Sequence, residues 1–183
     1  MGRLPELDPS QLSEQQRHIY DEILASRGGS ISGPFEAWLR SPMLADRAQR
    51  LGEYCRYQTS LPARLSELAI LITARQWRAN VEWQIHAPIA RQQGLSDELI
   101  AALHSGQEPS FEQADEKVVY QLAQQMYEKR RVSDETYRAA VAALGESAVV
   151  ELVGILGYYA LVAMTLNVFE VELPDQQLPP FEK

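Results

Sequence analysis

Glu82 and His86 stand four residues apart in the stretch NVEWQIHAPIARQQG. If this stretch is helical, both side chains lie on one face, where the carboxylate can hold the imidazole in a single tautomer. An imidazole oriented in this way can act as a general acid or base. The same spacing is also typical of an exposed charged pair on a helix, with Arg78 one turn before Glu82. Spacing alone therefore leaves both the catalytic and the ordinary interpretation open.

Glu67 is a second candidate, because it lies between Leu65 and Leu68 in an apolar stretch. A buried carboxylate needs a partner, and an imidazolium is a suitable one. Nineteen residues separate Glu67 from His86, so one straight helix would hold them roughly 28 Å apart. They can meet only if the chain turns back between them, and Asn80 is the plausible cap of a second helix. Periodicity alone does not pair them.

Metal and thiol chemistry find little support in the sequence. Cys55 is the only cysteine, which excludes an internal disulfide, a CxxC redox pair and a cysteine-based metal site, and favours a small buried apolar residue. His18, His86 and His104 lie far apart, and no HxxxH or HExxH spacing occurs. We therefore expect no metal ion and no other cofactor.

Length and charge limit the class of protein. A chain of 183 residues with 45% hydrophobic content predicts one domain, residues 1–183, with a sizeable core. The formal charge of -8 argues against nucleic acid as a partner, because phosphate binding needs a basic surface. The N-terminus has no apolar segment behind a basic start, so a cytoplasmic protein is expected.

The elements that must position these residues are predicted to be helices, in an all-α compact bundle. Helical periodicity dominates, and no convincing alternating strand or Asn-Gly or Asp-Gly hairpin occurs. Short connections indicate that successive helices pack together. The predicted helices cover residues 10–25, 35–39, 43–57, a segment capped at Ser60 with Pro62 in its first turn, 96–106, 114–129 after a capping box of Ser110 and Gln113, and a segment capped at Ser133.

The last helix is predicted at residues 152–169, which read LVGILGYYALVAMTLNVF without a charge. Eighteen residues without a charge meet the length of a membrane span. Thr165, Asn167, two glycines, two tyrosines and the lack of a basic flank favour a central helix, enclosed by neighbouring helices or a second subunit. No membrane partner is expected. Residues 171–183 form a proline-rich acidic tail that could lie over a neighbour.

The run SELAILITARQWRANVEWQIHAPIARQQGLSDELI resembles the core motif of the carboxymuconolactone decarboxylase and alkylhydroperoxidase D superfamily. The likeness is centred on residues 60–105 and extends from about Gly33 to Phe169. It implies an all-helical bundle in which the motif forms two helices with a turn between them. That turn would supply the chain reversal near Asn80. The resemblance also implies a homo-oligomer, a trimer or a hexamer.

In the peroxidase branch of this superfamily, the residues that match Glu67 and His86 serve a pair of cysteines spaced CxxC. The matching positions here are Ala79 and Glu82. Neither side chain can be oxidised and resolved as a disulfide, because that chemistry needs a thiolate. The resemblance therefore points to a cysteine-less branch.

What remains resembles the decarboxylase branch, whose members act on small carboxylates without a cofactor. It implies a lyase or isomerase for a small carboxylate or lactone, with His86 as acid and base, Glu67 orienting it, and Glu82 as a third catalytic candidate. Two alternatives stay open. One is a thiol peroxidase, against which the missing CxxC argues, and the other is a non-catalytic binding or assembly protein.

A carboxylate substrate needs a cationic partner, and arginine suits it best. Arg56, Arg64 and Arg75 flank the motif, and Arg56 is preferred because Tyr54 and Tyr57 surround it. Other side chains could complete the pocket. The candidates for its walls are Tyr57, Trp77 and Trp83, and those for polar groups from the last helix are Tyr158, Tyr159 and Asn167.

Overall fold

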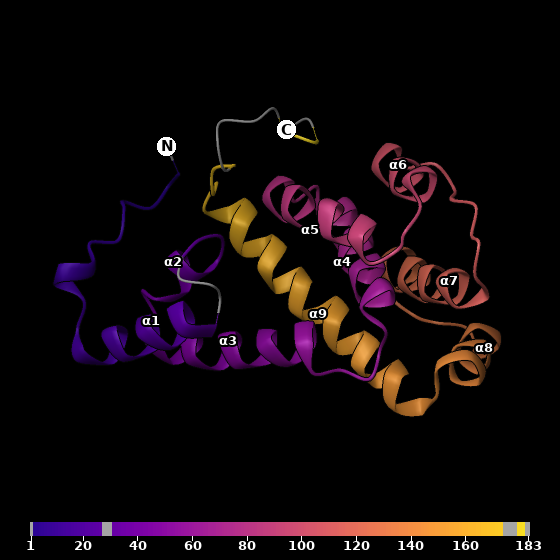
Figure 1. The fold of residues 1–183 in the computed structure, drawn as a ribbon, viewed down its shortest axis with the longest axis horizontal. Coiled ribbons are helices and arrows are strands. Elements are labelled where there is room, and N and C mark those ends of the chain that lie inside the picture. Colours follow the sequence, from indigo (N-terminus) through magenta and orange to yellow (C-terminus); the bar gives the residue numbers. More distant parts are fainter. Residues whose placement is uncertain (1, 27–30, 174–178, 182–183) are drawn as a thin grey trace.

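The computed structural model describes residues 2–26, 31–173 and 179–181 (Figure 1). The described residues form helices and connecting loops without a strand, as the sequence predicts. The helices are η1 (Pro9–Gln11), α1 (Glu14–Ser26), α2 (Phe35–Trp38), α3 (Pro42–Tyr57), α4 (Ala63–Trp77), α5 (Asn80–Gln92), α6 (Asp97–Ser105), α7 (Ala114–Lys129), α8 (Asp134–Leu144) and α9 (Glu146–Val168).

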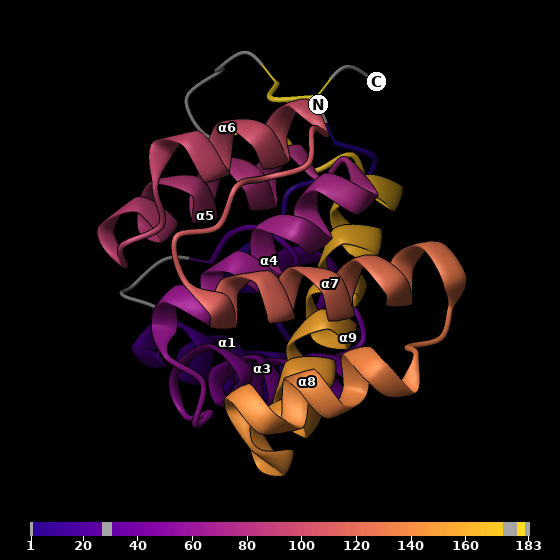
Figure 2. The same cartoon turned by 90° about the vertical axis from the view of Figure 1, so that its right-hand side faces the viewer.

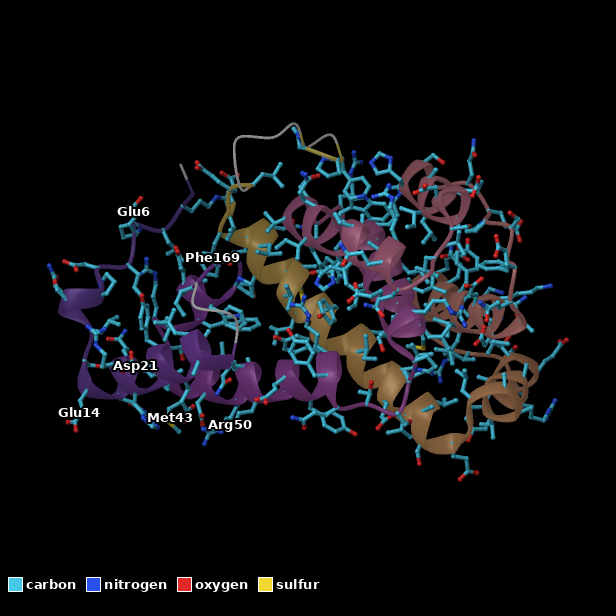
Figure 3. The ribbon with its side chains drawn as sticks, viewed as in Figure 1. Glu6, Glu14, Asp21, Met43, Arg50 and Phe169 are labelled. Carbon is cyan, nitrogen blue, oxygen red and sulfur yellow. The ribbon has the colours of Figure 1, made fainter. Side chains whose placement is uncertain are left out.

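Helices α4 and α9 form the centre of the bundle. Every residue of α4 from Leu65 to Ala74 is buried, because the helix packs against α5, α7 and α9. Helix α9 runs diagonally between α1–α3 on one side and α4–α8 on the other (Figure 1). From the side, α7 and α8 lie next to each other in front of α4 and α9 (Figure 2). One face of α1 and of α3 points outward, where Glu14, Met43 and Arg50 are exposed (Figure 3).

The reversal between α4 and α5 is a tight turn at Arg78. This residue adopts a left-handed conformation with φ of 50°, and the N–H of Ala79 donates to the carbonyl of Ala74 at 2.9 Å. Such a bond is typical of a helix C-terminus. The turn lies where the resemblance implied it. The prediction that Asn80 caps α5 is wrong. Ala79 holds the cap position, and the Asn80 amide oxygen accepts a hydrogen bond from the N–H of Phe181 at 2.7 Å.

Several predicted helix ends are corrected. The first long helix begins at Glu14 instead of residue 10, after the short helix η1. Helix α4 begins at Ala63, and Ser60 does not cap it, because its N–H and hydroxyl both donate to Glu151. In each case a polar residue that could cap a helix makes a different contact.

Two more corrections concern the C-terminal half. Helix α7 has a capping box, but Gln113 and Glu116 form it and Ser110 has no part in it. Helix α9 begins six residues before the predicted start, at Glu146 instead of Leu152. Two acidic residues therefore lie in its first two turns.

Helix α9 meets the length and composition of a membrane span, but more than half of its most apolar window is buried inside the bundle. It packs against α3, α4 and α8. This is the packing of a core helix, as expected. One face remains exposed and apolar, with Val150, Val153 and Val168 more than half accessible to solvent.

The end of the tail packs on the chain's own helices. Phe181 is buried with its ring 5.3 Å from that of Trp83, and the Pro180 carbonyl lies 2.8 Å from the His104 ring nitrogen. The tail was expected to lie over a neighbour, and for Pro180 and Phe181 that neighbour is their own chain. Residues 174–178 and 182–183 of the predicted tail lie outside the described residues.

Candidate active site

The turn at Arg78 brings Glu67 on α4 and His86 on α5 into contact. The Nδ1 atom of His86 lies 2.8 Å from a carboxylate oxygen of Glu67, and both side chains are about 95% buried. A carboxylate accepts hydrogen bonds, so Nδ1–H is the donor and Nε2 is the basic nitrogen. The pair therefore fixes the tautomer and the orientation of the imidazole, and leaves Nε2 to meet a ligand.

His86 lies in the wall of a cavity of about 250 Å³ between α3, α5, α9 and the loop before α2. Apolar and polar groups are mixed around it. Its lining consists of Ser32, Gly33, Pro34, Phe35, Arg56, Tyr57, Val81, Glu82, Ile85, His86, Tyr158, Tyr159, Val162 and Leu166. The structure thus brings His86, Glu82, Arg56 and Tyr57 to one cavity, with Glu67 behind His86.

Glu82 lies in this wall one helical turn before His86, and only 2% of it is exposed. Neither of its carboxyl oxygens has a hydrogen-bond partner among the described residues. Burial raises the pKa of the Glu82 carboxyl well above its ordinary value of 4.5, because an unpaired charge is costly in a low-dielectric interior. Burial therefore favours the neutral form of the Glu82 carboxyl. It does not pair with His86, although four residues separate them.

Tyr159 closes the cavity from α9. Its ring packs edge-on against His86, with ring centroids 5.2 Å apart and planes at 89°. Burial raises the pKa of the Tyr159 phenol well above its ordinary value, while the charge of Arg56 lowers it and that of Glu67 raises it. The phenol is therefore neutral, and it lies within reach of the field of both charged groups.

Arg56 is the one arginine or lysine in the lining of this cavity, within the part of the chain that the structure describes. It lies at the end of α3, with its guanidinium carbon 5.3 Å from the centroid of the Tyr57 ring. Stacking on an aromatic ring holds a guanidinium in place and leaves its N–H groups available. Arg56 can therefore receive a carboxylate at the mouth of the cavity.

The other two candidate arginines have structural contacts elsewhere. Arg64 pairs with Glu116 and, at 2.8 Å, with Asp115, and so joins the beginnings of α4 and α7. Arg75 lies over the ring of Phe181, 5.4 Å from its centroid. Neither lines the cavity of His86.

Trp83 also lies outside this cavity, contrary to its expected place in the pocket wall. Its ring packs against those of His104 and Phe181, at 5.3 Å from each. Trp77 accepts a hydrogen bond from Asn167 at its carbonyl, at 2.7 Å, and neither residue is part of the lining. Neighbouring positions on one helix can face different neighbours, so these side chains could not be placed reliably from the sequence.

Two parts of the site were not predicted from the sequence. They are one wall of the cavity and one glycine that leaves room for a tyrosine of α9. The wall is the loop at residues 32–34 with Phe35, which has no residue pattern that marks a binding loop. The glycine is Gly52, because a Cβ atom there would overlap the hydroxyl of Tyr158. A glycine inside a helix lowers its stability, so a glycine within a predicted helix is the one local sign in the sequence of such a close contact.

Cys55 is 1% exposed, and burial together with the charge of Glu151 raises the pKa of its thiol to about 11. A thiol in this state is a poor nucleophile at neutral pH. Among residues 2–26, 31–173 and 179–181, no three His, Cys, Asp or Glu side chains are grouped so that they could hold a metal ion.

No protein-family model matches the chain, and no curated protein sequence is significantly similar to it. Solved structures share its fold. The alkylhydroperoxidase AhpD core of a peroxidase-related protein from Ralstonia eutropha JMP134 has a TM-score of 0.78 over 97% of each chain, at 12% identity. A peroxidase-related protein from Silicibacter sp. TM1040 has a TM-score of 0.76 over 96% of this chain and 93% of its own, at 10% identity.

The debrominase Bmp8 has a TM-score of 0.72 over 93% of this chain and 91% of its own, at 13% identity. The chain therefore has the alkylhydroperoxidase D-like fold. The predicted fold class is confirmed, and the resemblance is confirmed at the level of the fold.

Proposed function

We propose that this chain is an enzyme of the cysteine-less branch of the carboxymuconolactone decarboxylase and alkylhydroperoxidase D superfamily, acting in the cytoplasm. It would be a cofactor-independent lyase or isomerase, of the decarboxylase type, for a small carboxylate or lactone. The observation that carries this proposal is the buried hydrogen bond between Glu67 and His86 at the wall of a cavity. A fixed imidazole next to an enclosed space is suited to proton transfer.

The proposed chemistry needs one proton at one carbon. In a decarboxylation, the bond between the carboxyl carbon and its neighbour breaks, carbon dioxide leaves, and the electron pair passes into a conjugated carbonyl. The imidazolium of His86 then gives its Nε2 proton to the carbon and recovers one from solvent. An isomerisation would use the same nitrogen to remove a proton from one carbon and return it to another. Glu67 acts through His86 and is a positioning residue.

The shape and charge of the cavity support a small anionic substrate. Its volume of about 250 Å³ lies below that of pockets for drug-sized ligands. Arg56 supplies the positive charge, and an arginine can bind both oxygens of a carboxylate at once. The neutral phenol of Tyr159 adds a polar group beside His86. We propose that the carboxylate lies toward Arg56 and the reacting carbon toward Nε2.

Thiol chemistry is disfavoured by the residues in place of the two cysteines. Ala79 is fully buried at the turn, Glu82 is a carboxyl, and the Cys55 thiol is buried. Among the proteins of this fold, a cysteine-to-alanine variant of the debrominase Bmp8 was crystallised with 2,3,4-tribromopyrrole. A small ring compound is thus a ligand of one such protein, which is consistent with a small cyclic substrate here.

The test is a screen of small cyclic and unsaturated carboxylates and lactones, followed by NMR for loss of carbon dioxide or for isomerisation. We expect His86→Ala to lower the rate by about 10²–10⁴-fold while leaving the helical content and the oligomer intact. His104→Gln is the matched control, because His104 lies outside the cavity. A His86→Ala protein with the wild-type rate would refute the mechanism. Ligand-induced thermal stabilisation without turnover would instead favour a binding protein.

We also propose that a second copy of the chain covers the exposed apolar face of α9, as part of the expected trimer or hexamer. Val150, Val153 and Val168 are more than half exposed on this central helix, and an apolar stripe of this kind is typical of an interface. Val153→Glu should lower the mass measured by sedimentation. An unchanged mass would place the interface elsewhere.

A further inference from the structure

We propose that Glu82 determines the specificity of the cavity by donating a hydrogen bond from its neutral carboxyl group to an uncharged oxygen of the ligand. The substrate would then be a monocarboxylate that also carries a carbonyl, such as a keto acid or a lactone acid. This inference rests on the proposed function, which places a carboxylate at Arg56, and it names the second group that the substrate must have.

The geometry of Glu82 calls for a partner that residues 2–26, 31–173 and 179–181 do not supply. The residue lies in the wall of the cavity on the same helix as His86, and both carboxyl oxygens are shielded from solvent. Neither oxygen has a hydrogen-bond partner within the described ranges. A buried polar group without a partner costs free energy, and such groups are rare in folded proteins. A ligand that accepts from Glu82 would remove this cost.

The charges around the cavity favour one carboxylate on the ligand. Arg56 is the single Arg or Lys side chain in the described lining, so it can balance a single negative charge. A second carboxylate of the ligand near Glu82 would be repelled by Glu82 when Glu82 is ionised, because an ionised carboxylate accepts hydrogen bonds and cannot donate one. An uncharged oxygen, in contrast, can accept from the neutral acid. The raised pKa of Glu82 supports this protonation state.

The groups that face Glu82 do not provide an alternative donor or acceptor pair. His86 and Tyr159 lie with it in the cavity wall, and Arg56 lies at the end of α3. Tyr127 on α7 lies within electrostatic reach of Glu82, and burial raises the pKa of the Tyr127 phenol to about 12. The Tyr127 hydroxyl already bonds to Thr73 at 2.8 Å. Glu82 is thus left to a ligand.

Three ring compounds of similar size test the inference by calorimetric titration of the full chain. They are 3-oxocyclopentanecarboxylate, cyclopentanecarboxylate and cyclopentanone. In mildly acidic buffer we expect the keto acid to bind about tenfold more tightly than cyclopentanecarboxylate, as one added hydrogen bond would give. The ratio of the two affinities is the readout, because effects of pH on the rest of the protein are common to both compounds.

Two variants keep the test specific to Glu82. In Glu82→Gln an amide N–H replaces the O–H, so the preference should persist and lose its dependence on pH. In the wild type, the preference should fall as the pH rises and Glu82 ionises. In Glu82→Met it should disappear at every pH. Circular dichroism confirms that each variant is folded before it is titrated.

The outcomes separate the inference from the function on which it rests. Equal binding of the two carboxylates by the wild type, or an unchanged preference in Glu82→Met, would overturn the role of Glu82 while carboxylate binding stands. If neither carboxylate binds more tightly than cyclopentanone, or if Arg56→Gln leaves their affinity unchanged, carboxylate recognition is wrong. The inference then falls with the proposed function.

Discussion

Replacement of Glu82 by glutamine is expected to stabilise the protein at neutral pH and to leave its stability in acid unchanged. The folded state keeps a proton on Glu82 that the unfolded chain releases above about pH 4.5, the ordinary pKa of the group. The raised pKa of Glu82 therefore contributes stability below that pH, and this contribution is lost as the pH rises toward the folded-state value. Glutamine, which is uncharged at every pH, has no such loss.

The magnitude follows from the linkage of one proton to unfolding. Between the unfolded and folded pKa values of Glu82, the free energy of unfolding of the wild type should fall by about 1.4 kcal/mol per pH unit relative to Glu82→Gln. For a chain of this size that is a difference in Tm of roughly 3–6 °C per pH unit. Other titrating groups are common to both proteins and cancel in the difference.

The assay is urea unfolding followed by circular dichroism, at closely spaced pH values from acid to neutral. Glu112→Gln is the control, because Glu112 is exposed and its removal should leave a curve parallel to that of the wild type. If the curves of the wild type and Glu82→Gln are also parallel, Glu82 titrates as an exposed carboxyl does. Its burial without a partner would then be wrong, and with it the basis of its proposed role.

Three further predictions concern the scaffold. Gly52→Ala should destabilise the protein by about 1–3 kcal/mol, because the new methyl group overlaps a tyrosine hydroxyl of α9. The control is Gly154→Ala, where the methyl group has open space. In the same urea assay it should be neutral or stabilising by up to about 1 kcal/mol. The Cys55 thiol, with its pKa raised to about 11 by burial, should react with a disulfide reagent only after unfolding; rapid reaction of the folded protein would contradict this. Hydrogen bonds from Ser60 lower the pKa of Glu151, so the stability that they contribute is present above pH 4.5 and is lost in stronger acid. Glu151→Gln should remove this acid-dependent part, which is below about 1 kcal/mol for an exposed group.

Local signals in the sequence predicted the helices but not all of their ends. Ser96 and Ser133 cap α6 and α8 as expected, each accepting a hydrogen bond from the backbone three residues on. Ser60 has the same residue type in a similar pattern, yet it bonds to Glu151 from α9. A capping residue can bond to whatever the tertiary fold places near it, and that neighbour is 91 residues away.

The contact between Glu67 and His86 could not be predicted from periodicity for a different reason. It depends on a turn at Arg78, a residue with a side chain that is seldom found at positive φ. No glycine or proline marks that turn. The resemblance to a known family implied the turn, because a fold can be shared where local propensity gives no signal. Glu82 is the opposite case. Its residue type is evident from the sequence, but its lack of a hydrogen-bond partner among the described residues depends on the packing of the whole bundle.

The position of Glu82 also bears on whether the cavity has a function. A carboxyl buried without a partner lowers stability at neutral pH, and an apolar side chain of similar size would avoid that cost. The cost falls on the wall of the cavity that also holds His86, which is itself hydrogen-bonded to the carboxylate of Glu67. Groups with strongly shifted pKa values gather at functional sites because chemistry or binding needs them in that state. The proposed site, which moves a proton and selects a neutral oxygen, would use both the paired imidazole of His86 and the unpaired acid of Glu82 on the same face of α5.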